Sequence, residues 1–170
     1  MLCGMANWGS LLRQAAKIGM DLLSSRTTPA DGDRGAARPQ ARSAPSGDRA
    51  RAVVYAPDLD GSADPGEIVW AWVPFEENDG RGKDRPLLVV GRQSGDLVGL
   101  MLSSQQDHSD DRDWVWIGSG AWDRAGRESF VRLDRVLEIG EHDIRREGAV
   151  LGRDRFERVA EELRGRFGWS

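Results

Sequence analysis

The chain has 170 residues, a single cysteine and a formal net charge of −4, which suits one domain and leaves little room for two. One cysteine excludes an intrachain disulfide and favours a reducing compartment, and no apolar run approaches the roughly 20 residues of a membrane-spanning helix. The apolar N-terminus lacks a preceding basic segment and is interrupted by Arg13 and Lys17, which argues against a secretory signal. We therefore expect a cytoplasmic protein.

Residues 1–26 contain a predicted amphipathic helix. Between residues 7 and 23, apolar side chains recur at helical spacing, while Arg13, Lys17 and Asp21 lie off that stripe. Such a helix is too short to be stable alone in water. We expect it to dock on the domain, on a partner or on a membrane surface.

Residues 27–63 begin with a run of Pro, Ala, Gly, Ser and Arg that is almost free of large apolar residues. This composition cannot offset the entropy lost on ordering, so we predict a disordered linker. Its arginines could form an auxiliary arm that tethers RNA, or the segment could be a solvated tether. The chain thus divides into residues 1–26, 27–63 and a domain of 64–170.

From residue 64 the sequence predicts a mainly β domain. Five apolar runs joined by Gly- and Asp-rich turns indicate strands: 68–73, 86–91, 97–102, 114–117 and 129–133. Closely spaced short strands of this kind are typical of a small barrel or a sandwich. The first run is apolar at every position, which predicts a strand buried on both faces. A C-terminal helix is predicted to begin at Asp154, because Asp154 and Glu157 have capping-box spacing.

Arg85 directly precedes Pro86 and the second apolar run. Proline has no backbone donor and is tolerated as the first residue of a strand, and it favours an extended conformation for the residue before it. The pattern would hold a guanidinium at a loop-to-strand junction, where it could bind a phosphate. An exposed arginine at the start of an ordinary hairpin strand is an equally good interpretation.

The two histidines give no zinc set with the lone cysteine, so we predict no metal site. His108 follows Ser103 closely and could reach a site there as a group that titrates near neutrality, or it could be a solvated loop residue. His142 is interpreted as a surface turn residue. The acids at 107–113 lack the glycine and closing glutamate of a calcium loop.

Four tryptophans in predicted strands are interpreted as core: Trp70, Trp72, Trp114 and Trp116. Trp122 either stacks a flipped base or packs in the core or a dimer interface.

Several of these motifs, taken in order, resemble the MazF/PemK toxins, which are endoribonucleases of bacterial type II toxin–antitoxin systems. The resemblance covers roughly residues 64–169 and rests on five segments: Gly66-Glu-Ile-Val-Trp70, Lys83-Asp-Arg85-Pro86, Leu100-Met-Leu-Ser-Ser104, residues 129–139, and residues 144–151 with the helix after them. It implies an SH3-like small barrel of the MazF/PemK/CcdB type with a C-terminal helix, assembled as a homodimer.

The resemblance also implies an activity and partners. It implies metal-independent cleavage of single-stranded RNA by attack of the 2′-hydroxyl, without a cofactor. It further implies inhibition by a cognate antitoxin protein, with DNA contact only through the antitoxin complex.

The family's site residues map onto this sequence with two departures. Arg85 and Ser103 stand where the family carries its catalytic arginine and a threonine or serine, although a strand-end turn is an alternative role for Ser103. The expected RNA-binding residues are Asp79, Arg81, Lys83, Ser104 and Gln105. Some members carry a glutamate in the first loop where this chain has Gly80, which leaves the general base unassigned. Asp79 could substitute, but an exposed carboxylate is a weak base at neutral pH.

Charge provides the main argument for a different class of function. Residues 1–63 carry eight of the 24 Lys and Arg and six of the 28 Asp and Glu, so residues 64–170 carry 16 basic and 22 acidic side chains, a net −6. Proteins that grip a nucleic-acid backbone usually present a basic face. The alternative is a catalytically weak or inactive SH3-like module that binds a protein, with the N-terminal segment as its targeting arm.

Overall fold

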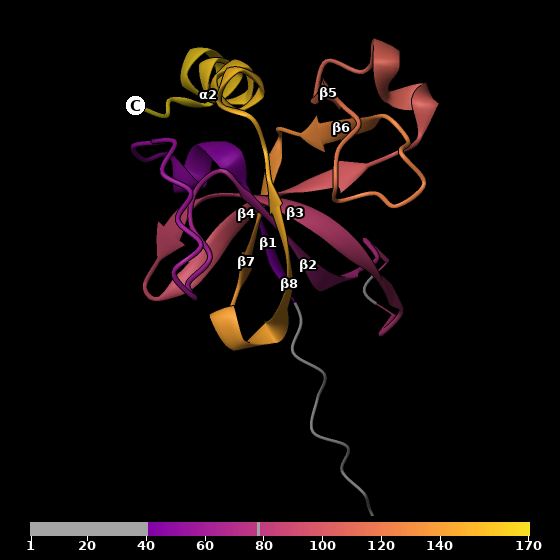
Figure 1. Cartoon of the computed structure of the whole chain (residues 1–170). Coiled ribbons are helices and arrows are strands. Elements are labelled where there is room, and N and C mark those ends of the chain that lie inside the picture. The colour runs from indigo at the N-terminus through magenta and orange to yellow at the C-terminus, as the bar shows by residue number, and fades with distance from the viewer. Residues whose placement is uncertain (1–40, 78) are drawn as a thin grey trace, which may run out of the picture. The chain divides into compact units, whose positions relative to one another are not determined.

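A computed structural model of the chain describes residues 41–77 and 79–170 (Figure 1). The helix predicted within residues 1–26 and the first part of the predicted linker lie outside the described residues. The described part consists of the following elements: β1 (Arg42–Pro45), η1 (Ser46–Arg49), β2 (Glu67–Pro74), β3 (Gly82–Gln93), β4 (Asp96–Ser103), η2 (Gln106–Asp110), β5 (Trp114–Gly118), β6 (Ser129–Arg132), β7 (Arg135–Ile139), η3 (Glu141–Asp143), β8 (Ile144–Val150) and α2 (Arg153–Phe167).

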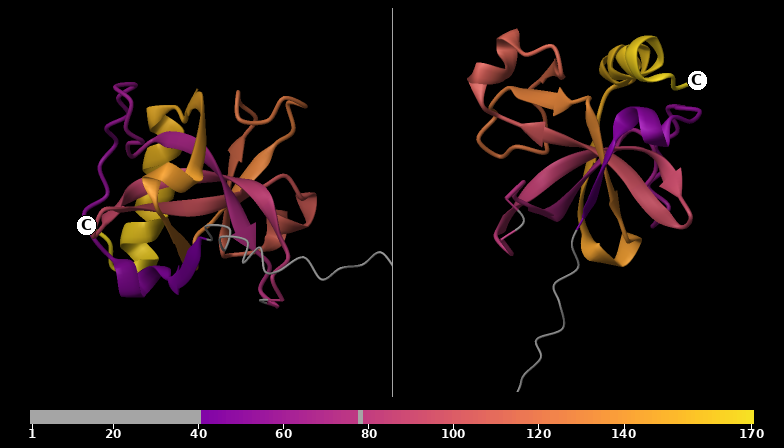
Figure 2. Two further views of the ribbon diagram at one scale, coloured as in Figure 1. Left: turned by 90° about the horizontal axis from the view of Figure 1, so that it is seen from below. Right: turned by 180° about the vertical axis from the view of Figure 1, so that it is seen from behind.

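The strands pair antiparallel throughout the described residues. Six of them follow the order β1-β7-β4-β3-β2-β8, while β6 pairs with both β4 and β5. Figure 2 shows the short β5–β6 pair and α2 at the same end of the long strands in the rear view. The prediction of a mainly β fold with one C-terminal helix is confirmed. The finer prediction, an SH3-like barrel, stays a prediction.

Strand β3 begins earlier than the sequence pattern predicts. It starts at Gly82 rather than Pro86, so Arg85 lies inside the strand opposite Ala71 and not at a loop junction. Pro86 is tolerated there because pairing with β4 begins only at Leu87, and residues 82–86 have β2 alone as a partner. Arg85 is therefore held by a regular strand backbone.

The core consists of two apolar clusters that share β2 and β3. One contains Leu88 and Val90 with the inner face of α2, and the other contains Leu87 and Val89. Alternate side chains of a strand point to opposite faces, so β3 is buried on both. Strand β2 is also buried on both faces, as predicted, through Ile68 and Val69 in different clusters.

The tryptophans predicted in strands are not all core residues. The side chain of Trp116 is 46 % exposed and carries the Arg158 guanidinium 5.6 Å from its ring centroid. Trp70, Trp72 and Trp114 are only half-buried. The buried aromatic rings of the larger cluster are instead those of Trp122, Phe156 and Trp169.

The predicted disordered linker is wrong for residues 41–63. These residues belong to the same compact unit as residues 64–170. Strand β1 pairs with β7, the Val53 side chain is buried, and the Val53 amide donates to the carbonyl of Ser170 at 2.8 Å. Scattered small apolar residues order this segment because they reach distant partners that local composition does not reveal.

The start of α2 also differs from the predicted capping box. Gly152 is the N-cap, and no side chain caps the helix; the amides of Arg155 and Phe156 instead donate to the Gly152 carbonyl at 3.0 Å. Asp154 lies in the first turn, where its charge complements the helix dipole. Among the described residues, no helix combines the length and apolar character that crossing a membrane requires.

Candidate functional site

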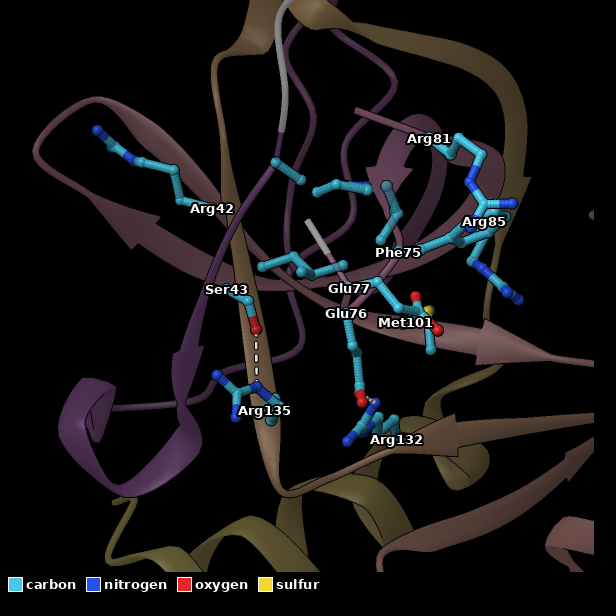
Figure 3. Close-up of a pocket in the computed structure, with 14 residues that line it drawn as sticks. Arg42, Ser43, Phe75, Glu76, Glu77, Arg81, Arg85, Met101, Arg132 and Arg135 are labelled. Atoms are coloured by element: carbon cyan, nitrogen blue, oxygen red, sulfur yellow. Dashed lines mark hydrogen bonds and ion pairs between the residues drawn. The ribbon is translucent and has the colours of Figure 1, made fainter. Parts of the chain in front are cut away.

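A pocket of about 1030 Å³ opens between β1, the β2–β3 loop, β3 and β7 (Figure 3). Its charged lining consists of five arginines, Arg42, Arg81, Arg85, Arg132 and Arg135, and of two glutamates, Glu76 and Glu77. Figure 3 shows Arg81 and Arg85 on one side and Ser43 and Arg135 on the other. The pocket is therefore locally basic although residues 64–170 are acidic overall.

Three of the pocket arginines are paired with carboxylates. Arg81 Nε lies 2.6 Å from Asp79 Oδ2, and Arg42 Nη2 lies 2.6 Å from Asp96 Oδ2. The charge of the Arg132 guanidinium is balanced by two carboxylates, those of Asp134 and Glu76, each at 2.7 Å. The hydrogen bonds that the Arg132 guanidinium donates, first to Asp134 and then to Glu76, raise its pKa above the ordinary value.

The other two pocket arginines have no carboxylate partner among the described residues. Arg85 is half-buried on β3, and within residues 41–77 and 79–170 its guanidinium has neither a hydrogen bond nor an ion pair. Arg135 donates from Nε only to the neutral Ser43 Oγ, at 2.8 Å. These two cations can offer their full charge to an anionic ligand.

The β2–β3 loop presents Arg81 in a fixed turn. The Phe75 amide donates to the Arg81 carbonyl at 3.0 Å, and the Arg81 amide donates to Asp79 Oδ1 at 3.0 Å. Both Asp79 oxygens are thus engaged by Arg81. Gly82 follows because a Cβ there would lie 2.5 Å from the Val73 carbonyl oxygen. This glycine is therefore required by close packing.

Ser103 ends β4 close to His108. Its Oγ lies 3.2 Å from His108 Nε2 and accepts a hydrogen bond from the Gln105 amide at 3.3 Å. The His108 ring stacks on Trp114 with centroids 3.7 Å apart and an interplanar angle of 12°. His108 is half-buried, so its interpretation as a solvated loop residue is wrong.

The strand register relates Ser103 to Arg85. Leu87 of β3 is opposite Met101 of β4, and Arg85 and Ser103 each lie two residues further along in the same direction. Because side chains alternate between faces, Arg85 and Ser103 are on the same face of the sheet, the face on which Met101 lines the pocket. Ser103 itself is only 6 % exposed.

The predicted site residues are only partly brought together. Arg81 and Arg85 line the pocket, whereas the other predicted site residues are absent from its lining: Asp79, Lys83, Ser103, Ser104 and Gln105. Sequence reasoning missed Ser43 and Arg135, which are 92 residues apart and meet only through the pairing of β1 with β7. No local pattern signals that contact.

Two remaining expectations concern other kinds of ligand. Trp122 is 3 % exposed and donates from Nε1 to Ser129 Oγ at 3.0 Å, so it is a core residue and the base-stacking alternative is wrong. The described residues contain no group of three or more His, Cys, Asp or Glu side chains placed to hold a metal ion.

Comparison with known protein families identifies the family of this chain. A family model described as PemK-like, MazF-like toxin of type II toxin-antitoxin system matches residues 64–167, which is more than half of the chain. No curated protein matches the chain. The matched residues include β2 to β8 and α2 but not β1, which contributes Arg42 and Ser43 to the pocket.

Proposed function

Because the chain belongs to the PemK-like, MazF-like toxin family of type II toxin–antitoxin systems, we propose that it is a metal-independent endoribonuclease that cleaves single-stranded RNA. The 2′-oxygen of the RNA attacks the adjacent phosphorus and the 5′-oxygen departs. A type II toxin implies a cognate antitoxin partner. We expect the antitoxin to hold the enzyme inactive, and any DNA contact to occur through their complex.

The uncompensated charge of Arg85 in the pocket carries this proposal. Attack at phosphorus adds negative charge to the phosphoryl oxygens, and a fixed cation that is not already neutralised stabilises that charge best. The planar guanidinium matches two phosphate oxygens at once. Arg132 is a weaker candidate because its ion pairs with Asp134 and Glu76 already neutralise its charge.

Ser103 is the second proposed catalytic residue. Its hydroxyl lies on the same face of the sheet as Arg85 by strand register and can orient the 2′-hydroxyl or the phosphate. The RNA strand would continue along Arg81, Lys83, Ser104 and Gln105, with Asp79 holding Arg81 in place. On the opposite wall of the pocket, Arg135 offers a second phosphate contact (Figure 3).

The local charge of the pocket supports nucleic-acid binding despite the acidic domain. Five arginines and two glutamates line it, whereas the acidic residues at 107–113 lie around η2. An excess of positive charge in a cleft attracts an anionic ligand more strongly than the same charges on an open surface. In the proposed homodimer each protomer would contribute one such pocket for binding RNA.

A protein-binding module is the second candidate function, favoured by the net −6 of residues 64–170. A long single-stranded RNA transcript incubated with the purified chain, with and without EDTA, separates the two candidates. The endoribonuclease cuts the transcript equally in both arms, and an Arg85→Ala variant cuts far less. Intact RNA in every arm would overturn the proposal and leave the binding module. Cleavage abolished by EDTA would contradict metal independence.

A further inference from the structure

We propose that His108 accepts the proton of the RNA 2′-hydroxyl through Ser103. This inference rests on the proposed endoribonuclease function and supplies the general base that the sequence leaves unassigned. Ser103 would touch the substrate, and His108 would act through it as a positioning and proton-accepting residue.

The hydrogen-bond pattern at Ser103 supports a proton relay. The Gln105 amide donates to Ser103 Oγ at 3.3 Å, which occupies an acceptor position of the hydroxyl and leaves its own hydrogen to be donated. The ring nitrogen Nε2 of His108 lies 3.2 Å from the same Oγ. In the tautomer protonated at Nδ1, Nε2 is an acceptor, so the serine hydrogen can point at it.

Packing holds the imidazole in this orientation. Its ring stacks on Trp114 at a centroid distance of 3.7 Å and meets the edge of Phe130 at 6.2 Å and 68°. Trp114 and Phe130 lie on the paired strands β5 and β6, and Ser103 is opposite Phe130. An acceptor fixed in place by two strands needs no reorganisation before it takes a proton.

The carboxylates near the pocket are poorer bases. Asp79 is engaged by Arg81 and Glu76 by Arg132. Glu77 lines the pocket and has no ion pair among the described residues, but an exposed carboxylate is mostly deprotonated and weakly basic at neutral pH. Because Glu77 nevertheless lines the pocket without an ion pair among the described residues, the test includes it as the rival base.

The proton inventory of the step is balanced. Ser103 Oγ takes the 2′-hydroxyl proton as its own proton passes to His108 Nε2. The 2′-oxygen forms a bond to phosphorus, the bond from phosphorus to the 5′-oxygen breaks, and the 5′-oxygen takes a proton from solvent water. The products are a cyclic phosphodiester, a 5′-hydroxyl, an imidazolium and the hydroxide left by that water, and proton transfer from the imidazolium to the hydroxide restores the neutral imidazole.

Charged and polar side chains lie near His108 on the elements packed against it. On η2 they are Asp107 and Asp110, followed by Asp111, whose amide donates to the His108 carbonyl. From β4, the neutral Ser103 contacts the ring. Next to β5, Asp113 is paired with Arg166. From β6, Arg132 lies 6.0 Å from the Trp114 centroid, and its charge is compensated by Asp134 and Glu76.

The substitution His108→Gln tests proton acceptance separately from orientation. Glutamine can still accept a hydrogen bond from Ser103 but cannot take its proton. We expect kcat on a single-stranded RNA transcript to fall by about 100-fold, the lower end of the range for general acid–base catalysis, with KM nearly unchanged. The parent rate should fall toward acid across roughly pH 5 to 8, where histidine ordinarily changes its charge, and His108→Gln should lack that limb.

Matched variants complete the test. His142→Gln changes the other histidine of the chain, which is exposed on η3, and it should leave the rate and its pH profile unchanged. The double variant Ser103→Ala with His108→Gln should be no slower than the slower single variant, because residues that act as a unit are not additive. Thermal melting of each variant confirms folding.

Each outcome decides between the two proposals. An active parent with a His108→Gln variant that keeps the full rate and the acid limb overturns the relay and leaves the endoribonuclease standing. Loss of the acid limb in Glu77→Gln instead assigns the base to Glu77 and also overturns the relay. A parent that does not cut RNA overturns both proposals.

Discussion

The indole Nε1 of Trp169 donates a hydrogen bond to the carbonyl of Ser46 at 3.0 Å, across 123 residues of sequence. The Trp169 side chain is buried, and the Ser46 hydroxyl donates to the carbonyl of Leu133. The segment after β1 is thus joined both to the end of α2 and to the start of β7, so the first and last parts of the described chain stabilise each other.

Trp169→Phe should lower the free energy of unfolding by about 1–3 kcal/mol, because it leaves a buried carbonyl without this donor. Urea unfolding followed by circular dichroism measures the change. Trp116→Phe is the matched control: that ring is 46 % exposed, and the expected change is within about 0.5 kcal/mol. Equal effects of the two substitutions would show that the contact contributes nothing specific.

A chain that begins at residue 64 should be far less stable than one that begins at residue 41. The shorter chain lacks β1, which covers the edge of β7, and the buried side chains of Val53 and Ala63. An uncovered strand edge also invites association. Melting curves and size-exclusion chromatography compare the two chains directly. If both melt at the same temperature, residues 41–63 do not stabilise the domain.

The sequence predicts those parts of the fold that depend on local pattern. The strands around Ile68, Leu88 and Leu100 alternate or run apolar between turn residues, and each contains the predicted run, although β3 begins four residues earlier. β1 could not be predicted, because only Ala44 of its four residues is buried and its partner β7 is about 90 residues away. Pairing over that distance depends on the whole sheet.

The same distinction applies to the site. His108 is five residues from Ser103, so the sequence could suggest that it reaches a site there. The contact of Arg135 with Ser43 arises from strand pairing alone, and no spacing rule applies to it. Strand β3 likewise extends to Gly82 because β2 pairs with it, which outweighs the local signal of Pro86 as a strand start.

Glu141 provides a stability change that depends on pH. It accepts hydrogen bonds from Arg92 Nη1 at 2.8 Å and from the Ala63 amide at 2.8 Å, and these, with Arg92 first, lower its pKa from 4.5 to about 2. A lowered pKa means that the charged form stabilises the fold above about pH 4.5, and that this contribution is lost as the pH falls toward 2.

Glu141→Gln should therefore destabilise the protein at pH 7 by about 1 kcal/mol, the upper range for partly exposed ion pairs. The difference from the parent should shrink steadily as the pH falls from about 4.5 toward 2 in urea unfolding. Glu128→Gln is the control, since Glu128 is exposed and has no ion pair among the described residues. A difference independent of pH would show that the charge of Glu141 is not responsible.

Arg135→Ala tests the wall of the pocket that faces Arg85. If Arg135 contacts a phosphate, its loss should weaken binding of a short single-stranded RNA roughly 5- to 10-fold and reduce the slope of log K against log salt by about 0.7. Binding is measured by fluorescence anisotropy in an Arg85→Ala background, which limits cleavage. Arg124→Ala, an exposed arginine outside the pocket, should change neither quantity. An unchanged salt slope in Arg135→Ala would remove this residue from the RNA path.

Arg85→Ala tests the proposed catalytic cation. Arg85 is half-buried with no hydrogen bond or ion pair among the described residues, so its removal should leave the melting temperature nearly unchanged. Cleavage should fall by at least about 10²-fold, as for the loss of one preorganised electrostatic group. Arg85→Lys should restore little of it, because an ammonium cannot contact two phosphate oxygens as the planar guanidinium does.

Ser103→Ala provides a comparison for the loss of cleavage expected in Arg85→Ala. A neutral hydroxyl makes weaker hydrogen bonds than a charged guanidinium, so Ser103→Ala should cost less than Arg85→Ala. Growth arrest on expression in a bacterial host should follow the same order as cleavage of a purified transcript: parent, Ser103→Ala, Arg85→Lys and Arg85→Ala. If Arg85→Ala cuts RNA and arrests growth as the parent does, phosphate stabilisation belongs to another residue, and Arg135 is the next to test because it too lacks a carboxylate partner among the described residues.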